Sequence, residues 1–238
     1  AWLRMLAGGG GSGLTLEQPE NNIVRGAYYG LVAALAGAQT VALCCYDEAY
    51  TIPTGYAQRI SLRTLQLLTE EMGLADTVDP LGGSYYVEAL TNRLEKEAYD
   101  TFEKIKKVGG VVPGIEKGWF QNEIARASRR YQDEIERRQR IIVGVNDYIE
   151  ENEKIEIPIL YIDESSERAQ NEHLARLRAE RDAHEVKAAL AGLRRAAEGT
   201  ENVVPHLIRC AHAGCTEGEM IGTLRGVFGE YREPAYSF

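Results

Sequence analysis

Two adjacent carboxylates, Asp47 and Glu48, follow an uninterrupted apolar run at residues 41–45, with Tyr46 between them and the run. Such a run is typical of a parallel β-strand that is buried on both faces. In parallel α/β folds, active sites are built at the carboxyl ends of the strands, so the acid pair lies where cofactor contact or catalysis is expected. The alternative is that the two acids cap the helix that follows them.

A second short apolar run, at residues 2–7, leads into the sequence GGGGSG at residues 8–13. Residues with almost no side chain leave open space and exposed backbone N–H groups at the end of a strand, which suits a bulky ligand or an anion. The run is not a phosphate-binding loop, because no Gly-Lys-Ser/Thr sequence follows it. The alternative is a flexible linker.

The elements that position these residues are three strand–loop–helix units. The predicted strands and helices alternate, at residues 2–7, 23–36, 41–45, 54–72, a short strand from Ala75, and 85–108. Strands separated by helices of this length imply parallel pairing with right-handed crossovers. The predicted fold class is therefore α/β.

The rest of the chain is predicted to be mostly helical. A charged helix at residues 120–138 precedes a brief strand at 141–145, and residues 157–160 form a docking strap within an extended segment. Further helices are expected at residues 166–180, 182–198, 202–213 and 216–228. Ser165, Asp182 and Thr216 are the predicted N-caps, with Thr216 and Glu219 forming a capping box.

Composition limits the classes of partner. With 44% hydrophobic and 26% charged residues, the 238-residue chain is expected to be globular with an ample core. Its net charge of −9 argues against a nucleic-acid partner, although local Lys and Arg side chains can still hold small anions. No apolar run is long enough to span a membrane and no signal-peptide pattern opens the chain, so a cytoplasmic location is predicted.

The cysteines and histidines show no metal-binding pattern. Cys44 and Cys45 lie in the predicted strand, whereas Cys210 and Cys215 are far along the chain, at a spacing that fits no common zinc site. All four are interpreted as reduced core residues, because free cysteine behaves as a small hydrophobe. The histidines are interpreted as surface or structural, and no metal is predicted.

A family resemblance is carried by seven segments, namely LTLEQPENNIVRGAYYGLVAALAGAQT, YDEAYTIP, DTVDPLGGSYYVEALT, GVVPGIEKG, IIVGVNDY, RLRAERDAHEVKAAL and CTEGEMIGTLRGVFGEYREP. Together they resemble the large subunit of the adenosylcobalamin-dependent methylmalonyl-CoA mutase family, in order and over essentially the whole chain. The resemblance implies an isomerase that rearranges the carbon skeleton of an acyl-CoA through radicals.

The resemblance also implies an architecture. Members of the family have a catalytic (β/α)8 TIM barrel that threads the CoA substrate along its axis, then a helical linker and a flavodoxin-like cobalamin-binding domain. Residues 1–146 resemble the last three strand–helix units of the barrel, and residues 147–238 resemble the linker. A partial barrel followed by a mostly helical linker is therefore expected. The N-terminal half of the barrel, where the catalytic residues are expected, is a required partner, so the chain alone should be inactive.

The ending FGEYREPAYSF resembles that of large subunits whose cobalamin domain is a separate polypeptide. A separate cobalamin-binding small subunit, which would hold the cobalt, is thus a second expected partner, beside the acyl-CoA substrate. Within this chain, Glu48 matches the family glutamate that hydrogen-bonds the ribose of the adenosyl group. A carboxylate suits that role because it can accept from two vicinal hydroxyls.

The resemblance implies three further site residues. Thr51 and Gly11 match positions near the adenosyl group or substrate, and Gln39 matches a substrate-side glutamine in the strand lining the axis.

The chain departs from the family pattern at two places. Where the family commonly has His-Thr-Gln-Thr-Ala-Gly, residues 6–11 are LAGGGG, and where it has His-Thr-Asn-Ser, residues 42–45 are ALCC. Polar side chains have thus left the barrel axis, and Gly8 and Cys44 become the expected contacts of an acyl group bulkier or more apolar than methylmalonyl. The alternative function is a non-catalytic structural or assembly subunit derived from a mutase barrel, with Glu48 only a helix cap.

Overall fold

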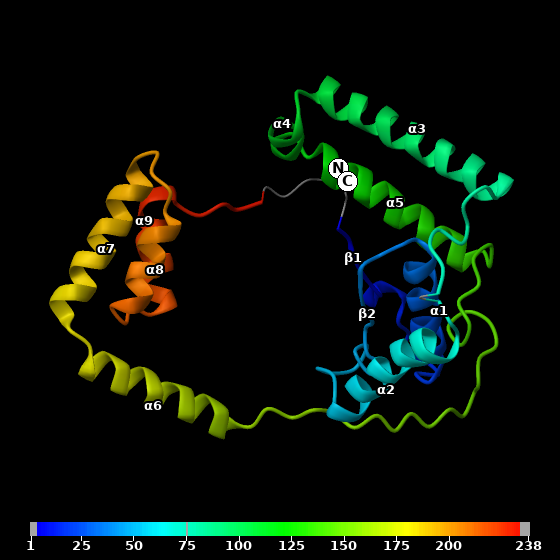
Figure 1. Ribbon diagram of the computed structural model, residues 1–238, viewed down its shortest axis with the longest axis horizontal. Helices are drawn as coiled ribbons and strands as arrows, with labels where there is room; N and C mark the ends of the chain where they lie inside the picture. Colours follow the sequence, from blue (N-terminus) through cyan, green and yellow to red (C-terminus); the bar gives the residue numbers. More distant parts are fainter. Residues whose placement is uncertain (1–3, 75, 234–238) are drawn as a thin grey trace. The chain divides into compact units, whose positions relative to one another are not determined.

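The computed structural model describes residues 4–74 and 76–233 (Figure 1). The chain divides into two compact units, and the boundary between them falls between Leu160 and Tyr161. The N-terminal unit contains the parallel strands, and the C-terminal unit is helical. Among the described residues, none of the helices is both long enough and apolar enough to cross a membrane.

The N-terminal unit is built on a small parallel sheet of β1 (Leu6–Gly8) and β2 (Thr40–Ala42). Leu6 pairs with Thr40, and Gly8 pairs with Ala42. The connection between the strands contains α1 (Asn21–Leu35), as a parallel pair requires. The predicted parallel pairing is therefore confirmed, although both strands are shorter than expected and residues 2 and 3 lie outside the described part.

Helices cover one face of this sheet. α1 contacts both strands and packs against α2 (Gly55–Gln66) and the π-helix Leu67–Glu71 that continues it. An added Cβ at Gly30 would lie 2.9 Å from Leu68 Cδ1 and 3.3 Å from Leu65 Cδ2, so glycine allows this close helix packing. The opposite face is solvent-exposed and carries Leu6, Gly8, Thr40 and Ala42.

The third predicted strand is not formed in the described residues. Residues 76–78 make bends, Val78 is 93% exposed, and Ala75 lies outside the described part. Residues 141–145 likewise form no strand, and the segment contributes a single parallel bridge between Val143 and Asp147. A short strand is stable only when a neighbour completes its hydrogen-bond ladder, which neither segment has here. The structure is thus a mostly helical α/β unit with a small sheet.

Helices α3 (Tyr85–Val108), α4 (Val111–Glu116) and α5 (Trp119–Glu136) follow in the N-terminal unit. α3 has the predicted bounds, and Gly109 ends it in a left-handed conformation with φ of 112°. Beyond α5, the extended segment returns to the first part of the unit. Leu160 N donates to Thr51 Oγ1 at 3.1 Å, and Gln18 N donates to Glu153 Oε1 at 2.7 Å. Of the predicted docking strap at residues 157–160, Leu160 makes one of these contacts.

The C-terminal unit consists of α6 (Glu164–Glu180), α7 (Ala183–Glu198), α8 (Val204–His212) and α9 (Glu217–Phe228). The predicted N-cap at Ser165 is wrong, because Asp163 caps α6 by accepting from Ser165 N at 2.7 Å. The cap at Asp182 and the capping box of Thr216 with Glu219 are confirmed.

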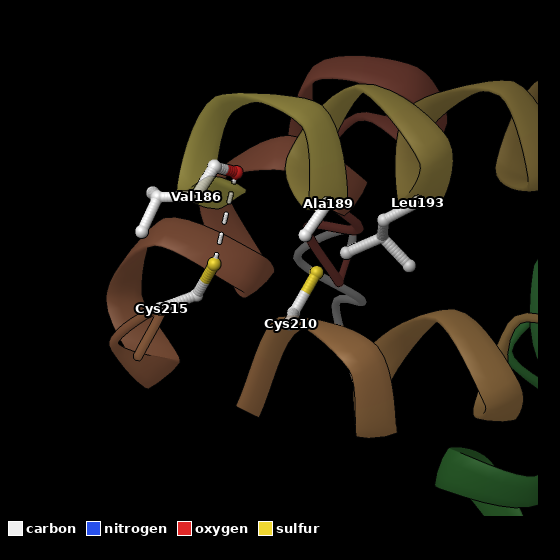
Figure 2. Close-up of a cluster of buried hydrophobic side chains, with 5 residues drawn as sticks. All are labelled: Val186, Ala189, Leu193, Cys210 and Cys215. Atoms are coloured by element: carbon white, nitrogen blue, oxygen red, sulfur yellow. Dashed lines mark hydrogen bonds between the residues drawn. The ribbon is translucent and has the colours of Figure 1, made fainter. Parts of the chain in front are cut away.

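Figure 2 shows the core of this unit, where α7 meets α8 and the start of α9. Its buried members are Val186, Ala189, Leu193, Cys210 and Cys215. Cys210 and Cys215 are free and buried, as predicted. Burial, together with the neighbouring Cys215, raises the pKa of Cys210 to about 11, so this thiol stays protonated at neutral pH.

A charged pair ties α9 to the end of α6. Arg181 donates to both carboxylate oxygens of Glu219, at 2.7 and 2.6 Å, and its Nη1 also donates to Gly214 O at 2.9 Å. Thr216 N donates to the same carboxylate at 2.8 Å. The bond from Arg181, with those from Thr216, lowers the pKa of Glu219 to about 2.

This pair predicts an acid sensitivity of the C-terminal unit. The pKa of Glu219 is about 2 when folded and about 4.3 in an unfolded chain, so the unfolded state binds more protons between these values. The stabilisation of the folded C-terminal unit by the ionised Glu219 is fully present above the unfolded pKa and is lost as the pH falls toward 2. We expect hydrogen exchange over residues 183–228 to show stability falling over this window, and falling less in Glu219→Gln. Glu217→Gln, in the same helical turn, is the control, and equal pH slopes in all three proteins would contradict the assignment.

Candidate functional site

The carboxyl ends of β1 and β2 continue into two loops that run side by side. Gly9 N donates to Ala42 O at 2.9 Å, just beyond the strand pairing. An added Cβ at Gly9 would lie 3.3 Å from Cys44 N and 3.4 Å from Tyr29 Cδ2. The close approach of the two loops and α1 therefore leaves little room for a side chain at Gly9.

The glycine loop, residues 8–13, forms a turn that packs against α1. It ends in a 3-10 turn over Gly11–Gly13, where an added Cβ at Gly13 would overlap the Tyr29 hydroxyl. At Gly11, by contrast, no atom lies within 4 Å of an added Cβ. The loop thus packs against Tyr29 of α1 at Gly9 and Gly13 and leaves open space at Gly11.

Asp47 supports the start of α2. Its side chain is 1% exposed, and its Oδ2 accepts from Thr54 N at 3.0 Å and from Thr54 Oγ1 at 2.9 Å. Thr54 is in turn the N-cap of α2, because its Oγ1 accepts from Ala57 N at 3.2 Å. The N-cap of α2 is therefore Thr54 and neither of the two acids, and Asp47 acts by holding this capping residue in place.

Glu48 lies at the carboxyl end of β2 with an exposed side chain. Its Oε1 accepts from Cys45 N at 2.5 Å, so the carboxylate is held over the acid turn, which we define as residues 45–51.

Cys44 lies between this carboxylate and the glycine loop, and its Sγ donates to Gly9 O at 2.6 Å. Burial raises the pKa of the Cys44 thiol, and the charge of Glu48 raises it further, so Cys44 contributes a neutral thiol. Cys44 is only half-buried, unlike the core residue predicted.

The structure brings most of the predicted site residues to one end of the sheet. Gly8 ends β1 on the exposed face, where an added Cβ would meet Ala42 O at an ordinary 3.7 Å. Thr51 closes the acid turn by donating its N–H to Asp47 O at 3.1 Å. Its hydroxyl already accepts from Leu160 N of the strap.

Gln39 lies at the opposite, amino end of β2. Its Oε1 accepts from Met5 N at 2.7 Å and its Nε2 donates to Gly37 O at 2.7 Å, so its amide ties the start of β2 to β1. It also lines a cavity of about 530 Å³ beside the ends of α1 and α2. The length of β2 therefore separates Gln39 from Glu48.

Two residues of α1 that the sequence did not single out join the two loops. Asn22 is 1% exposed and bonds both Thr15, which follows the glycine loop, and Tyr46, in the acid turn. Arg25 donates to Asn22 Oδ1 at 2.8 Å. The sequence could have indicated Asn22, because this residue shares a helix face with the small buried residues Gly26 and Gly30. A polar side chain on such a face must be hydrogen-bonded within the protein.

Comparison with known proteins places the chain in a family. Residues 1–230 match the family described as methylmalonyl-CoA mutase. The large subunit of 2-hydroxyisobutanoyl-CoA mutase from Aquincola tertiaricarbonis is 40% identical over 222 residues, which are 92% of this chain and 40% of that protein. Methylmalonyl-CoA mutase from Rhizobium meliloti is 38% identical, over 92% of this chain and 31% of that protein. Methylmalonyl-CoA mutase from Escherichia coli is also 38% identical, over 94% of this chain and 32% of that protein.

The chain therefore spans between 31% and 40% of the length of these relatives, while nearly all of it is matched. The resemblance carried by the seven sequence segments is confirmed by these comparisons. Relatives of this kind are acyl-CoA isomerases, and the chain belongs to the methylmalonyl-CoA mutase family.

Proposed function

We propose that this chain is the C-terminal part of the large subunit of an adenosylcobalamin-dependent acyl-CoA mutase. The observation that carries the proposal is the exposed Glu48 carboxylate, held at the carboxyl ends of two parallel strands beside the open space above Gly11. Ligand sites of parallel α/β proteins form at this end of the sheet. The reaction is the radical rearrangement of the carbon skeleton of an acyl-CoA.

The residues at this end of the sheet fit an adenosyl group. Gly11 offers space for a planar ring system, and the Glu48 carboxylate can accept from the two ribose hydroxyls. Thr51 lies in the same turn. Adenosylcobalamin, when bound, supplies the radical chemistry, with its cobalt held by a separate domain or subunit. This chain then binds and orients the nucleoside part.

The exposed face of the sheet is the proposed wall of the substrate channel. Leu6, Gly8 and Ala42 on this face are apolar or small, and the neutral thiol of Cys44 lies beyond its carboxyl end. Gln39, by contrast, lines the cavity beside α1 and α2, so it is not part of this wall. One relative is named for 2-hydroxyisobutanoyl-CoA, which has a branched acyl group. This name supports a branched or bulkier acyl substrate for the present chain.

The unpaired outer edges of the sheet are the basis for the partners that we propose. β1 and β2 pair with each other in the described residues, and each offers its outer edge for a further strand. We propose that the N-terminal half of a (β/α)8 barrel, in the same polypeptide or another, closes onto these edges and supplies the catalytic residues. A separate cobalamin-binding subunit completes the complex, which we place in the cytoplasm. The chain is inactive without these partners.

A second candidate is a non-catalytic assembly subunit that keeps part of a mutase barrel. The bond from Cys45 N to Glu48 Oε1 favours it, because a carboxylate that closes its own turn has a structural role without any ligand. In this case Glu48 serves the acid turn alone, and substitution should leave cofactor binding unchanged.

Replacing Glu48 distinguishes the two candidates. In the complete complex, Glu48→Ala is expected to weaken adenosylcobalamin binding by roughly 10- to 100-fold, the usual effect of losing charge-assisted hydrogen bonds. Spectroscopic titration measures this directly. Glu48→Gln keeps an acceptor for Cys45 N but loses the charge, so an intermediate loss is expected. Glu70→Ala, an exposed carboxylate on the π-helix, is the control. A Glu48→Ala complex that binds adenosylcobalamin and turns over like the parent would contradict the proposed cofactor contact of Glu48. The assembly-subunit function would then be the better candidate.

A further inference from the structure

Asn22, in the first turn of α1, uses the whole hydrogen-bonding capacity of its amide. Its Nδ2 donates to Thr15 O at 2.9 Å and to Tyr46 O at 3.1 Å. Its Oδ1 accepts from Thr15 N at 3.1 Å and from Arg25 Nη1 at 2.8 Å. Two donors and two acceptor sites are all that an amide side chain has. With 1% of its surface exposed, Asn22 is an internal connector between chain segments.

The segments that Asn22 connects are the two loops of the proposed site. Thr15 lies just after the glycine loop, and Tyr46 lies in the acid turn, two residues before Glu48. Strand pairing ends at Gly8 and Ala42, and beyond it the bonds from Gly9 N to Ala42 O and from Cys44 Sγ to Gly9 O join the first residues of the two loops. Farther along the loops, Asn22 provides one link, and the Tyr50 hydroxyl, which donates to Leu16 O, provides another. The Asn22 amide is thus a bridge beyond the end of the sheet.

Arg25 fixes which way the Asn22 amide faces. Its Nη1 donates to Asn22 Oδ1 and, at 2.7 Å, to Thr15 Oγ1, while its Nη2 donates to Val143 O at 3.1 Å. Because the guanidinium can only donate, Oδ1 must face Arg25, and Nδ2 must face the two carbonyls. An aspartate at this position would direct a second oxygen at those carbonyls, so the amide is specifically required.

We propose that Asn22 is a positioning residue that sets the separation between the glycine loop and the Glu48 carboxylate. The inference rests on the proposed function, in which an adenosyl group lies between these two elements. Asn22 would not touch the ligand. It acts by presenting both loops at the spacing that the ligand needs, so that binding does not have to order them first.

The first test needs no cofactor. In the cofactor-free complex, Asn22→Ala and Asn22→Asp are expected to speed hydrogen exchange at residues 14–16 and 45–51, with residues 183–228 unchanged. Asn22→Asp keeps the size of the side chain, so it remains informative if the alanine variant folds poorly. Asn21→Ala is the matched control, because the neighbouring amide donates to Gln18 Oε1 at 2.9 Å and lies outside the bridge. Exchange at the two loops that is no faster than in Asn21→Ala would overturn the proposal.

The second test is a double-mutant cycle on cofactor affinity. Asn22→Asp alone is expected to weaken adenosylcobalamin binding about tenfold in the complete complex, but less than twofold when Glu48 is already alanine. A merely structural role would give the same loss in both backgrounds, and equal losses would overturn the positioning role. If Glu48→Ala itself binds like the parent, the proposed function fails, while the exchange experiment still decides whether Asn22 holds the two loops together.

Discussion

Replacing Leu193 with alanine is expected to destabilise the C-terminal unit by about 2–5 kcal/mol, the usual cost of a large-to-small change in a core. Leu193 is fully buried at 0% exposure, and it lies on the α7 face that packs against α8 and α9. Its removal leaves a cavity in the cluster that Figure 2 draws. The free energy is measured by hydrogen exchange over residues 183–228, which separates this unit from the rest of the chain.

The matched control is Ile208→Ala on α8, where the isoleucine is 54% exposed. It removes a similar volume of side chain without opening a buried cavity, so a change of less than about 1 kcal/mol is expected. Similar losses in the two variants would show that the cluster around Leu193 is not what holds these helices together.

The parts of the fold that could be predicted from sequence are those encoded locally. The bounds of α3 follow from its apolar periodicity and from the glycines at 109 and 110 that end it. The Thr216–Glu219 capping box was predictable for the same reason, because both partners lie within one helical turn. The position of the acid pair after a strand also followed from the abrupt change of polarity at Asp47.

The parts that could not be predicted depend on partners distant in sequence. The segment from Asp76 and the segment at 141–145 have strand-like composition, but a strand forms only where another strand accepts its hydrogen bonds. In the acid pair, sequence could not show that Asp47 turns toward Thr54 while Glu48 turns toward Cys45. The role of Asn22 depends on two carbonyls, seven and 24 residues away, that only the folded chain brings together.

The complete complex is expected to convert a branched or bulkier acyl-CoA with a higher kcat/KM than methylmalonyl-CoA. A pocket built to hydrogen-bond a polar group strongly rejects analogues that lack it, whereas an apolar pocket changes by only about 1–3 kcal/mol for each methylene. On the exposed sheet face, Leu6 is apolar and Gly8 has no side chain, and Cys44 is engaged with Gly9 O. Apart from the Thr40 hydroxyl, these residues of the proposed wall offer space and little hydrogen bonding to a carboxylate-bearing acyl group.

Restoring a side chain at Gly8 tests this explanation. An added Cβ there would lie 3.7 Å from Ala42 O, an ordinary contact, so Gly8→Gln can be accommodated by the backbone. The variant is expected to shift the ratio of kcat/KM values toward methylmalonyl-CoA by roughly tenfold or more, because it both fills space and supplies hydrogen-bonding groups. Ser12→Gln, in the same loop beyond the strand, is the control. A parent complex that already prefers methylmalonyl-CoA would show that side chains from the other half of the barrel fill the space left by the glycines.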